Sequence, residues 1–163
     1  GDSWRLVESL WNREERKQWF GGGADAPGIH SVLARGRHLV IAVSCGGVWR
    51  SPDNGASWEL IGAGMLAPYM PPGQEKNANI QDVHRMARCE AKPEVVWVQH
   101  HGGIYRSIDG GSTFKAVSSA FGFGVVAHPK DPDTAWFVPA IKDELRYPAE
   151  GRLAVTVAAS PSA

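Results

Sequence analysis

Residues 46–61 read GGVWRSPDNGASWELI, and residues 102–117 read GGIYRSIDGGSTFKAV. Both stretches contain an octet of the form S-x-D-x-G-x-[ST]-[WF], at residues 51–58 and again, about 56 residues later, at 107–114. The first four residues, GDSW, match the end of the same octet. A turn motif that returns at a spacing of about 40–50 residues or slightly more is typical of a repeat protein. We therefore interpret the chain as a short repeat array.

Each octet has the residues of a tight turn between two strands. Its Asp can accept hydrogen bonds from the backbone N–H groups that follow, and its Gly can adopt the left-handed conformation that such a turn needs. Its Ser can join the two strand ends, and its final aromatic can pack against a neighbouring unit. We expect a structural and not a catalytic role for these positions: Ser51, Asp53, Gly55 and Trp58 in the first octet, and Ser107, Asp109, Gly111 and Phe114 in the second.

The octets resemble the Asp-box, or BNR repeat, of sialidase-like β-propellers, and through the repeat the resemblance extends over nearly the whole chain. The same box occurs in several glycoside hydrolase families, in sortilin-type receptors and in photosystem assembly factors. The resemblance implies an all-β fold made of propeller blades, each a four-stranded antiparallel sheet with an Asp-box turn. Because those proteins have unrelated activities, the resemblance predicts the fold and leaves the function open.

About three blades fit within the chain, as repeat units at about residues 4–58, 58–114 and 114–163. Closed propellers have about 4–8 blades, so we expect an incomplete propeller that is a fragment with a truncated N-terminus. That truncation leaves the localisation undetermined. An open arc of blades would expose apolar faces and strand edges, so self-association is also expected.

Alternating and continuous apolar runs predict where the strands lie. In the first unit they are expected at residues 29–34, 38–43, 46–50 and 58–61, and in the second at 83–88, 95–100, 103–106 and 113–117. The third unit is expected to have strands at 125–128, 134–138 and 152–157, with a long insertion at 139–151. Before the first unit, a short strand is expected at 5–7, and residues 12–18 are either one or two helical turns or a solvated surface loop.

Composition excludes some classes of partner. The 17 basic and 17 acidic residues cancel, so the chain has no basic field to attract nucleic acid or an anionic membrane. No apolar run approaches the roughly 18 residues of a membrane span. We expect neither nucleic acid nor a membrane as a partner. Cys45 and Cys89 are expected on opposite faces of the propeller, too far apart for a disulfide.

A binding site is expected on the face of the propeller opposite the octets, which we call the upper face. In a blade of four antiparallel strands, the octet turn lies on one face, and the connections between blades lie on the other. Sites favour loops that are held by a rigid scaffold. The ligand-binding candidates on the upper face are His30, His84, His100, His101 and Arg146.

Several roles are open for these side chains. The histidines could hold the loops by bonding to the backbone, or could bind a sugar or similar hydroxylated molecule together with nearby carboxylates. Asp82, Asp143 and Glu144 are weak candidates for general acid–base catalysis. Ligation of a transition metal by His84 with His100 or His101 has no support from an HxH or HExxH spacing. We therefore expect no metal and no cofactor.

The leading functional hypothesis is a propeller that binds a carbohydrate or a protein partner on its upper face. One alternative is a glycoside-hydrolase-like enzyme whose acid–base carboxylates lie partly outside this chain. Another is an assembly or scaffold factor. A true sialidase is not expected, because Arg50 and Arg106 directly precede the octets on the opposite face, and the Arg-Ile-Pro sequence of sialidases is absent.

Overall fold

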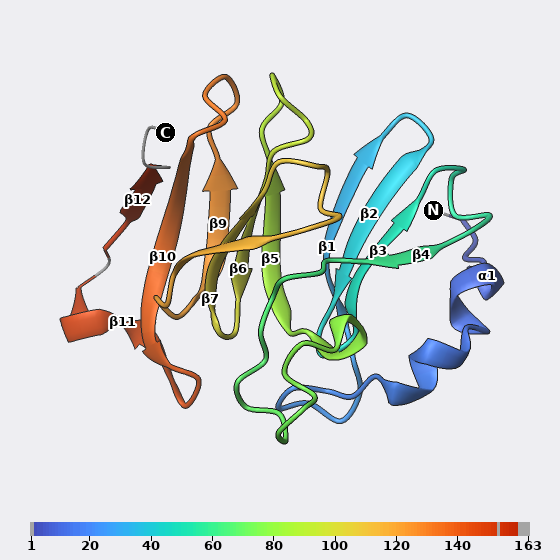
Figure 1. Cartoon of the computed structure of the whole chain (residues 1–163), viewed down its shortest axis with the longest axis horizontal. Helices are drawn as coiled ribbons and strands as arrows, with labels where there is room; N and C mark the ends of the chain where they lie inside the picture. The colour runs from blue at the N-terminus through green and yellow to red at the C-terminus, as the bar shows by residue number, and fades with distance from the viewer. Residues whose placement is uncertain (1, 153, 160–163) are drawn as a thin grey trace.

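Three antiparallel sheets make up most of the molecule. The computed structural model describes residues 2–152 and 154–159, and its sheets follow one another across the molecule in sequence order, from the first at the right of Figure 1 to the third at the left. Four short helices accompany the sheets in the described part of the chain: α1 (Glu8–Trp11), η1 (Glu14–Gln18), η2 (Ala78–Ile80) and η3 (Ala149–Gly151). None of these helices is long and apolar enough to cross a membrane.

The first two sheets have the strand order of propeller blades, which confirms the predicted fold class. The first sheet contains, in order, β1 (Ile29–Arg35), β2 (His38–Val43), β3 (Gly47–Ser51) and β4 (Glu59–Ile61). The second contains, in order, β5 (Val83–Arg88), β6 (Val96–His100), β7 (Gly103–Ser107) and β8 (Lys115–Ser118). All five residues of β6 are buried. This burial explains why that strand lacks the polar alternation of a half-exposed strand.

The third sheet differs from the other two in its insertion. Its strands are β9 (Gly122–Ala127), β10 (Thr134–Lys142), β11 (Leu145–Pro148) and β12 (Thr156–Ala159). The first half of β10 pairs with β9 on one side and with β12 on the other, so β12 takes the place of a third blade strand. The predicted insertion at 139–151 is not a separate loop. It continues β10 and returns as β11, which forms a hairpin projecting beyond the sheet.

Three hydrophobic layers hold the sheets together. The first lies between the first two sheets and contains Ala42, Val48, Ile61, Met65, Val83, Met86, Val96, Val98, Tyr105 and Phe114. The second lies between the second and third sheets and contains Cys89, Val95, Trp97, Ile104, Val125, Ala135 and Phe137. A third layer, on the outer side of the first sheet, contains Leu10, Ile41, Val43, Trp49 and Trp58. Each sheet therefore buries apolar side chains against its neighbour, as propeller blades do.

The two octets form the same hydrogen-bonded turn at the end of the third strand of their sheets. In the first, Ser51 Oγ accepts from the N–H of Gly55 at 2.7 Å and donates to Asp53 Oδ1 at 2.9 Å. Asp53 in turn accepts from the N–H of Ser57 at 2.8 Å and from its hydroxyl at 2.6 Å. Gly55 has a φ of 87°, which a residue with a Cβ adopts only with strain. The predicted turn chemistry is confirmed.

The second octet repeats these contacts and also joins two sheets. Ser107 Oγ accepts from the N–H of Gly111 at 2.9 Å, and Asp109 accepts from the N–H and hydroxyl of Thr113 at 2.9 and 2.6 Å. The chain leaving β4 bonds to this turn, because Ala63 N–H donates to Ser112 O and Ala63 O accepts from Phe114 N–H at 2.7 Å. The octet is thus a turn within one sheet and a tie to the preceding sheet.

The predicted strand at residues 5–7 is wrong, because this segment leads into α1 and η1 instead. The helical segment that follows packs on the outer face of the first sheet, where Leu10 is buried and the Trp19 ring meets Trp49 edge-on, with centroids 5.7 Å apart. Ser9 Oγ also donates to Gly55 O in the first octet. Extended pairing would leave Leu10 and Trp19 unburied, which accounts for the helical path. Trp4 is 96% exposed, so within the described residues it does not pack against a neighbouring unit as the aromatic of an octet would.

The outer face of the third sheet is left open in the described chain. Val126, Val138 and Val157 on that side are exposed. The two outer faces of the arc therefore differ, because residues 7–19 cover only the one on the first sheet. The expected self-association stays a prediction, and it concerns the face of the third sheet.

We expect Ser51→Ala to lower the free energy of unfolding by about 1–3 kcal/mol, because the buried N–H of Gly55 would lose its acceptor. Urea unfolding followed by circular dichroism measures this change. The matched control is Ser119→Ala, at an exposed serine between β8 and β9, for which we expect a change within about 0.5 kcal/mol. Equal effects of the two substitutions would contradict a structural role for the octet.

We expect the octet to stabilise the fold less in acid. Hydrogen bonds from the hydroxyl and N–H of Ser57 lower the pKa of Asp53 to about 2. A carboxyl whose pKa is depressed on folding stabilises the folded state above its unfolded pKa, near 4, and this contribution is lost as the pH falls towards 2. The difference in unfolding free energy between wild type and Asp53→Asn should therefore shrink from pH 5 to pH 2.5 in urea titrations. A difference that is constant across this range would contradict the assignment.

Candidate functional site

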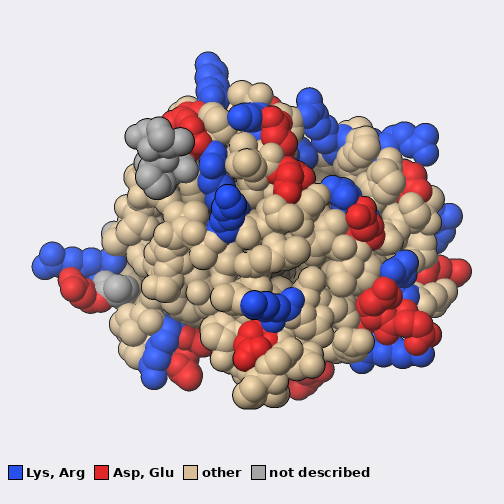
Figure 2. Space-filling model, viewed as in Figure 1, with Lys and Arg blue, Asp and Glu red and all other residues tan. Residues whose placement is uncertain are grey.

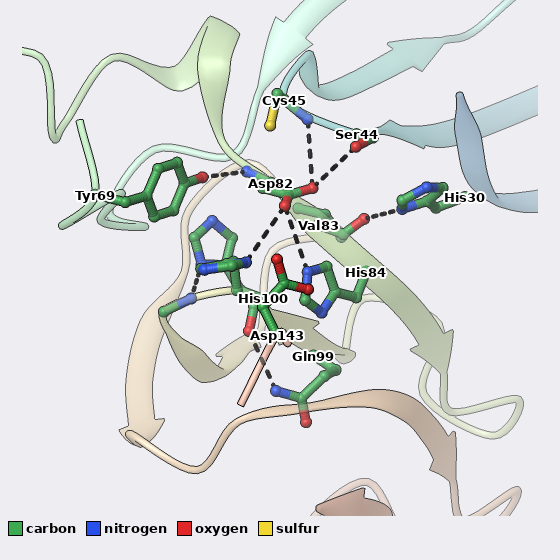
Figure 3. A network of polar contacts seen from close by, with 12 residues as sticks. His30, Ser44, Cys45, Tyr69, Asp82, Val83, His84, Gln99, His100 and Asp143 are labelled. Carbon is green, nitrogen blue, oxygen red and sulfur yellow. Dashed lines mark hydrogen bonds and ion pairs between the residues drawn. The ribbon is translucent and has the colours of Figure 1, made fainter. Parts of the chain in front are cut away.

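Asp82 lies at the centre of the upper face, where the long connection from the first sheet enters β5 (Figure 3). Two neighbours fix its backbone. Its N–H donates to the hydroxyl of Tyr69 at 3.1 Å, and its carbonyl accepts from the N–H of His101 at 2.9 Å. Just before it, the buried Gln81 donates to two carbonyls of the same connection, those of Glu75 and Asn77. The connection is therefore an ordered support for this carboxylate.

The Asp82 carboxylate is buried and contacts polar groups on both oxygens. Oδ1 accepts from Ser44 Oγ at 3.2 Å and from Cys45 N–H at 3.4 Å, both in the turn between β2 and β3. Oδ2 faces His84 Nε2 at 3.4 Å and His101 Nδ1 at 3.6 Å. Burial alone would raise the pKa of Asp82, but the histidine contacts outweigh it and hold the pKa well below its usual range. The group is therefore a buried carboxylate anion.

The two histidines beside Asp82 come from different elements. His84, in β5, has its Nδ1 at 2.7 Å from the carbonyl oxygen of Gly122 in β9, and its ring stacks on Phe123 with centroids 4.6 Å apart. His101 follows β6 and meets the rings of Tyr69 and Phe121 edge-on. The contact with Asp82 raises the pKa of His101, against a smaller opposing effect of burial. β5 and the turn after β6 thus present both histidines to one carboxylate, and β9 of the third sheet holds the His84 ring in place.

His100 lies inside the protein. Its side chain is fully buried against Tyr105, and its Nδ1 accepts from the N–H of Gly102 at 2.8 Å. Burial lowers the pKa of His100 to about 3, because the charged imidazolium would lose its hydration. The neighbouring Gln99 is also buried. Its Nε2 donates to the carbonyl of His100 (Figure 3) and to the carbonyl of Ala120. The structure therefore places His100 in the interior, where it supports the turn that presents His101.

A pocket of about 220 Å³ opens beside Asp82 and His84. The first sheet contributes His30, whose Nδ1 lies 3.2 Å from the carbonyl oxygen of Val83, and the hydroxyl of Ser44. The hairpin of the third sheet contributes Arg146, whose NH2 group donates to Asp143 Oδ1 at 2.8 Å. Residues 22–28, which precede β1, close the remaining side. Donors and acceptors from all three sheets line this pocket.

The structure brings together six of the residues singled out in the sequence. Asp82, His84 and His101 touch directly, and His30, Asp143 and Arg146 line the pocket beside them. Glu144 is not part of the group, because it lies exposed in the β10–β11 turn, 3.5 Å from Lys142 Nζ. Whether these residues bind a ligand remains a prediction.

Sequence reasoning did not single out the aromatic side chains of the site. Tyr69, Phe121 and Phe123 surround the histidines. Tyr69 and Phe121 lie in connections with no periodic pattern, and Phe123 lies at the start of β9, before the strand expected at 125–128. Trp4 and His30 are 26 residues apart in the sequence, as are Trp58 and His84. Connections of equal length before β1 and β5 indicate ordered loops, and this was the available signal for Tyr69 and for residues 22–28.

Charge on the face of the molecule that Figure 2 shows is mixed. Figure 2 shows Lys and Arg side chains interspersed with Asp and Glu, without a broad surface of one sign on the visible face. The positive groups of the pocket are local and paired. Arg146 bonds to Asp143 and lies over the Phe123 ring, with its guanidinium carbon 5.2 Å from the ring centroid.

Comparison with solved structures shows the β-propeller fold. An ancestral GH74 enzyme matches with a TM-score of 0.53 and 18% sequence identity, covering 76% of this chain and 14% of that chain. The structure of YCF48 bound to D1 peptide matches with a TM-score of 0.44 and 18% identity, covering 73% of this chain and 36% of that chain. The chain therefore spans a minor part of either protein. No protein-family model and no curated protein sequence matches the chain.

We expect the Cys45 thiol to be unreactive in the folded protein. Burial, followed by the nearby Asp82 charge, raises the pKa of Cys45 to about 12, so its thiolate fraction at pH 8 is roughly a thousandfold below that of a free cysteine. In a Cys89→Ser variant, modification by a disulfide reagent should be slow in the native state and fast in urea. Fast modification of the folded variant would show that Cys45 is accessible.

Proposed function

We propose that this propeller binds a small hydroxylated ligand, such as one sugar residue, in the pocket on its upper face. The proposal rests on the lining of this pocket, where hydrogen-bond donors and acceptors come from all three sheets. These residues are His30, Ser44, Asp82, His84, Asp143 and Arg146. Sugar hydroxyls donate and accept at once, so they can satisfy such a mixed lining. The volume of about 220 Å³ suits one ring better than an extended ligand.

Binding accounts for the carboxylates better than glycoside hydrolysis does. A hydrolase needs a carboxylic acid whose pKa is raised, so that it can protonate the leaving oxygen. The pKa of Asp82 is lowered, and its four polar contacts already occupy both oxygens. A backbone hydrogen bond and the Lys142 charge lower the pKa of Glu144, which also lies outside the pocket. Hydrolysis, a protein partner and a scaffold role stay secondary predictions.

We also propose that the chain belongs with the Asp-box propellers. Support comes from the two octets, whose Ser, Asp and Gly residues make the same internal hydrogen bonds at the same place in successive sheets. The same hydrogen-bonded turn occurs twice, at the same position in successive sheets. This agrees better with a BNR repeat than with a coincidental match of the two sequences.

Ligand-observed NMR with a panel of neutral hexoses, amino sugars and uronic acids tests the binding proposal. We expect at least one member to bind, and Arg146→Ala or Asp143→Asn to weaken it by about tenfold or more, because a lost charged hydrogen bond is worth about 1.5–3 kcal/mol. Arg37→Ala, in the β1–β2 turn near the first octet, is the matched control and should bind as wild type does.

Absence of binding across the panel, or binding that the pocket substitutions leave unchanged, would overturn the proposal. The same panel as chromogenic glycosides tests the secondary prediction. Turnover that Asp82→Asn abolishes would replace the binding function by hydrolysis.

A further inference from the structure

We propose that Asp82, His84 and His101 form a binding site for a divalent transition-metal ion of the zinc type. One possible ligand atom from each residue lies within 4.8 Å of the other two, and Asp82 Oδ2 approaches His84 Nε2 and His101 Nδ1. Two imidazoles and one carboxylate are a donor set that suits zinc and related ions. The sequence spacing gave no hint of it, because the three residues come together only when the turn after β6 folds against the start of β5.

The distances within the group fit a shared ion better than direct hydrogen bonds. Asp82 Oδ2 lies 3.4 Å from His84 Nε2 and 3.6 Å from His101 Nδ1, which is long for charge-assisted bonds of about 2.7–2.9 Å. Zinc bonds of about 2.0–2.1 Å at tetrahedral angles separate neighbouring ligand atoms by roughly 3.3–3.5 Å. The two measured separations are close to the edges of such a tetrahedron. A rotation of the half-buried His101 ring can shorten the third edge.

The hydrogen bond on the far side of His84 leaves the required lone pair free. Its Nδ1 lies 2.7 Å from the carbonyl oxygen of Gly122, which can only accept, so Nδ1 carries a proton. In the neutral ring Nε2 then has a lone pair, and that lone pair faces a carboxylate oxygen. That arrangement is repulsive unless a positive charge, either a proton on Nε2 or a metal ion, lies between the two atoms. Metal-bound histidines commonly donate their second N–H to a carbonyl in this way.

The carboxylate ligand is oriented in the same manner. Ser44 Oγ and Cys45 N–H donate to Oδ1, which leaves Oδ2 directed at the histidines. The backbone bond from His101 N–H to Asp82 O, at 2.9 Å, fixes two of the ligands relative to each other. The rings of Tyr69, Phe121 and Phe123 pack around the imidazoles and keep the site partly dry. The structure therefore contains both the three side chains that would bind the ion and the groups that orient them.

Three protein ligands leave a fourth position open on a tetrahedral ion. Asp82 and His84 also line the pocket of about 220 Å³, so the open position would adjoin the space assigned to the ligand. A metal there could hold a hydroxyl or carboxylate oxygen. The metal site itself does not rest on the proposed sugar binding, because its three ligands and their supports are complete without it.

Metal titration of the untagged protein tests the inference. The protein is stripped with a chelator and titrated with Zn²⁺ against a chromophoric competitor, and with Co²⁺ while the visible spectrum is recorded. We expect one ion per chain and the intense visible bands of tetrahedral cobalt. His101→Gln should weaken binding at least as much as loss of an outer-shell partner does, about 10–100-fold, and His84→Gln should do the same.

The matched control is His38→Ala, at the exposed start of β2, which should leave metal affinity unchanged. Circular dichroism and urea unfolding confirm that each variant is folded. If His101→Gln alone folds, it is sufficient for the test, because its side chain is the least buried of the three. Sugar binding measured with and without chelator separates failure of the metal site from failure of the proposed function.

Two results would overturn the inference. One is the absence of stoichiometric binding of either metal to the folded wild type. The other is ¹⁵N NMR showing that both ring nitrogens of His84 stay protonated at pH 7 in the presence of Zn²⁺, which would make the group an ion pair only.

Discussion

The first strands of the three sheets, β1, β5 and β9, pack closely against one another. This packing determines where the side chains of the candidate site lie. Side-chain bonds across these strands hold them in register: Ser31 Oγ accepts from Met86 N–H, and His84 Nδ1 donates to Gly122 O. Because all three strands begin at the same face, the residues at their starts must meet there. His30, His84 and Gly122 are such residues. The site is therefore a product of strand direction as much as of residue type.

A buried carboxylate at this meeting point constrains the surrounding loops. Removing the charge of Asp82 from water costs several kcal/mol, and the loss is offset only when both oxygens have partners. Those partners come from the β2–β3 turn, from β5 and from the turn after β6. Displacing any one loop would leave a charge without compensation. The loops of the upper face consequently form one cooperative unit, with Asp82 as its common contact.

The octets made the turns and the two faces predictable from sequence, and the apolar runs beside them made most of the strands predictable. The same Ser, Asp and Gly residues form hydrogen bonds within a few residues of the chain. Such local hydrogen bonds depend little on the rest of the sequence. This is why the turn bonds of Ser51 and Ser107 follow the pattern expected from the sequence. The path of residues 5–19 was not predictable, because Leu10 and Trp19 gain their burial only from Trp49 and Trp58, which are distant in sequence.

The sequence predicted which residues of the candidate site lie near one another, but it did not predict which of their atoms are in contact. Topology places His30, Asp82, His84 and His101 on one face, yet it does not say which atoms meet. His100 and His101 are adjacent in the sequence, but their side chains point in different directions. His100 packs against Tyr105 in the interior, and His101 contacts Asp82. The β10–β11 hairpin carrying Asp143 and Arg146 projects beyond its sheet. The length and the residues of this hairpin can therefore change at little cost to folding, and under the proposed function such changes would alter which ligand binds. Each octet residue, by contrast, makes a bond that substitution would break.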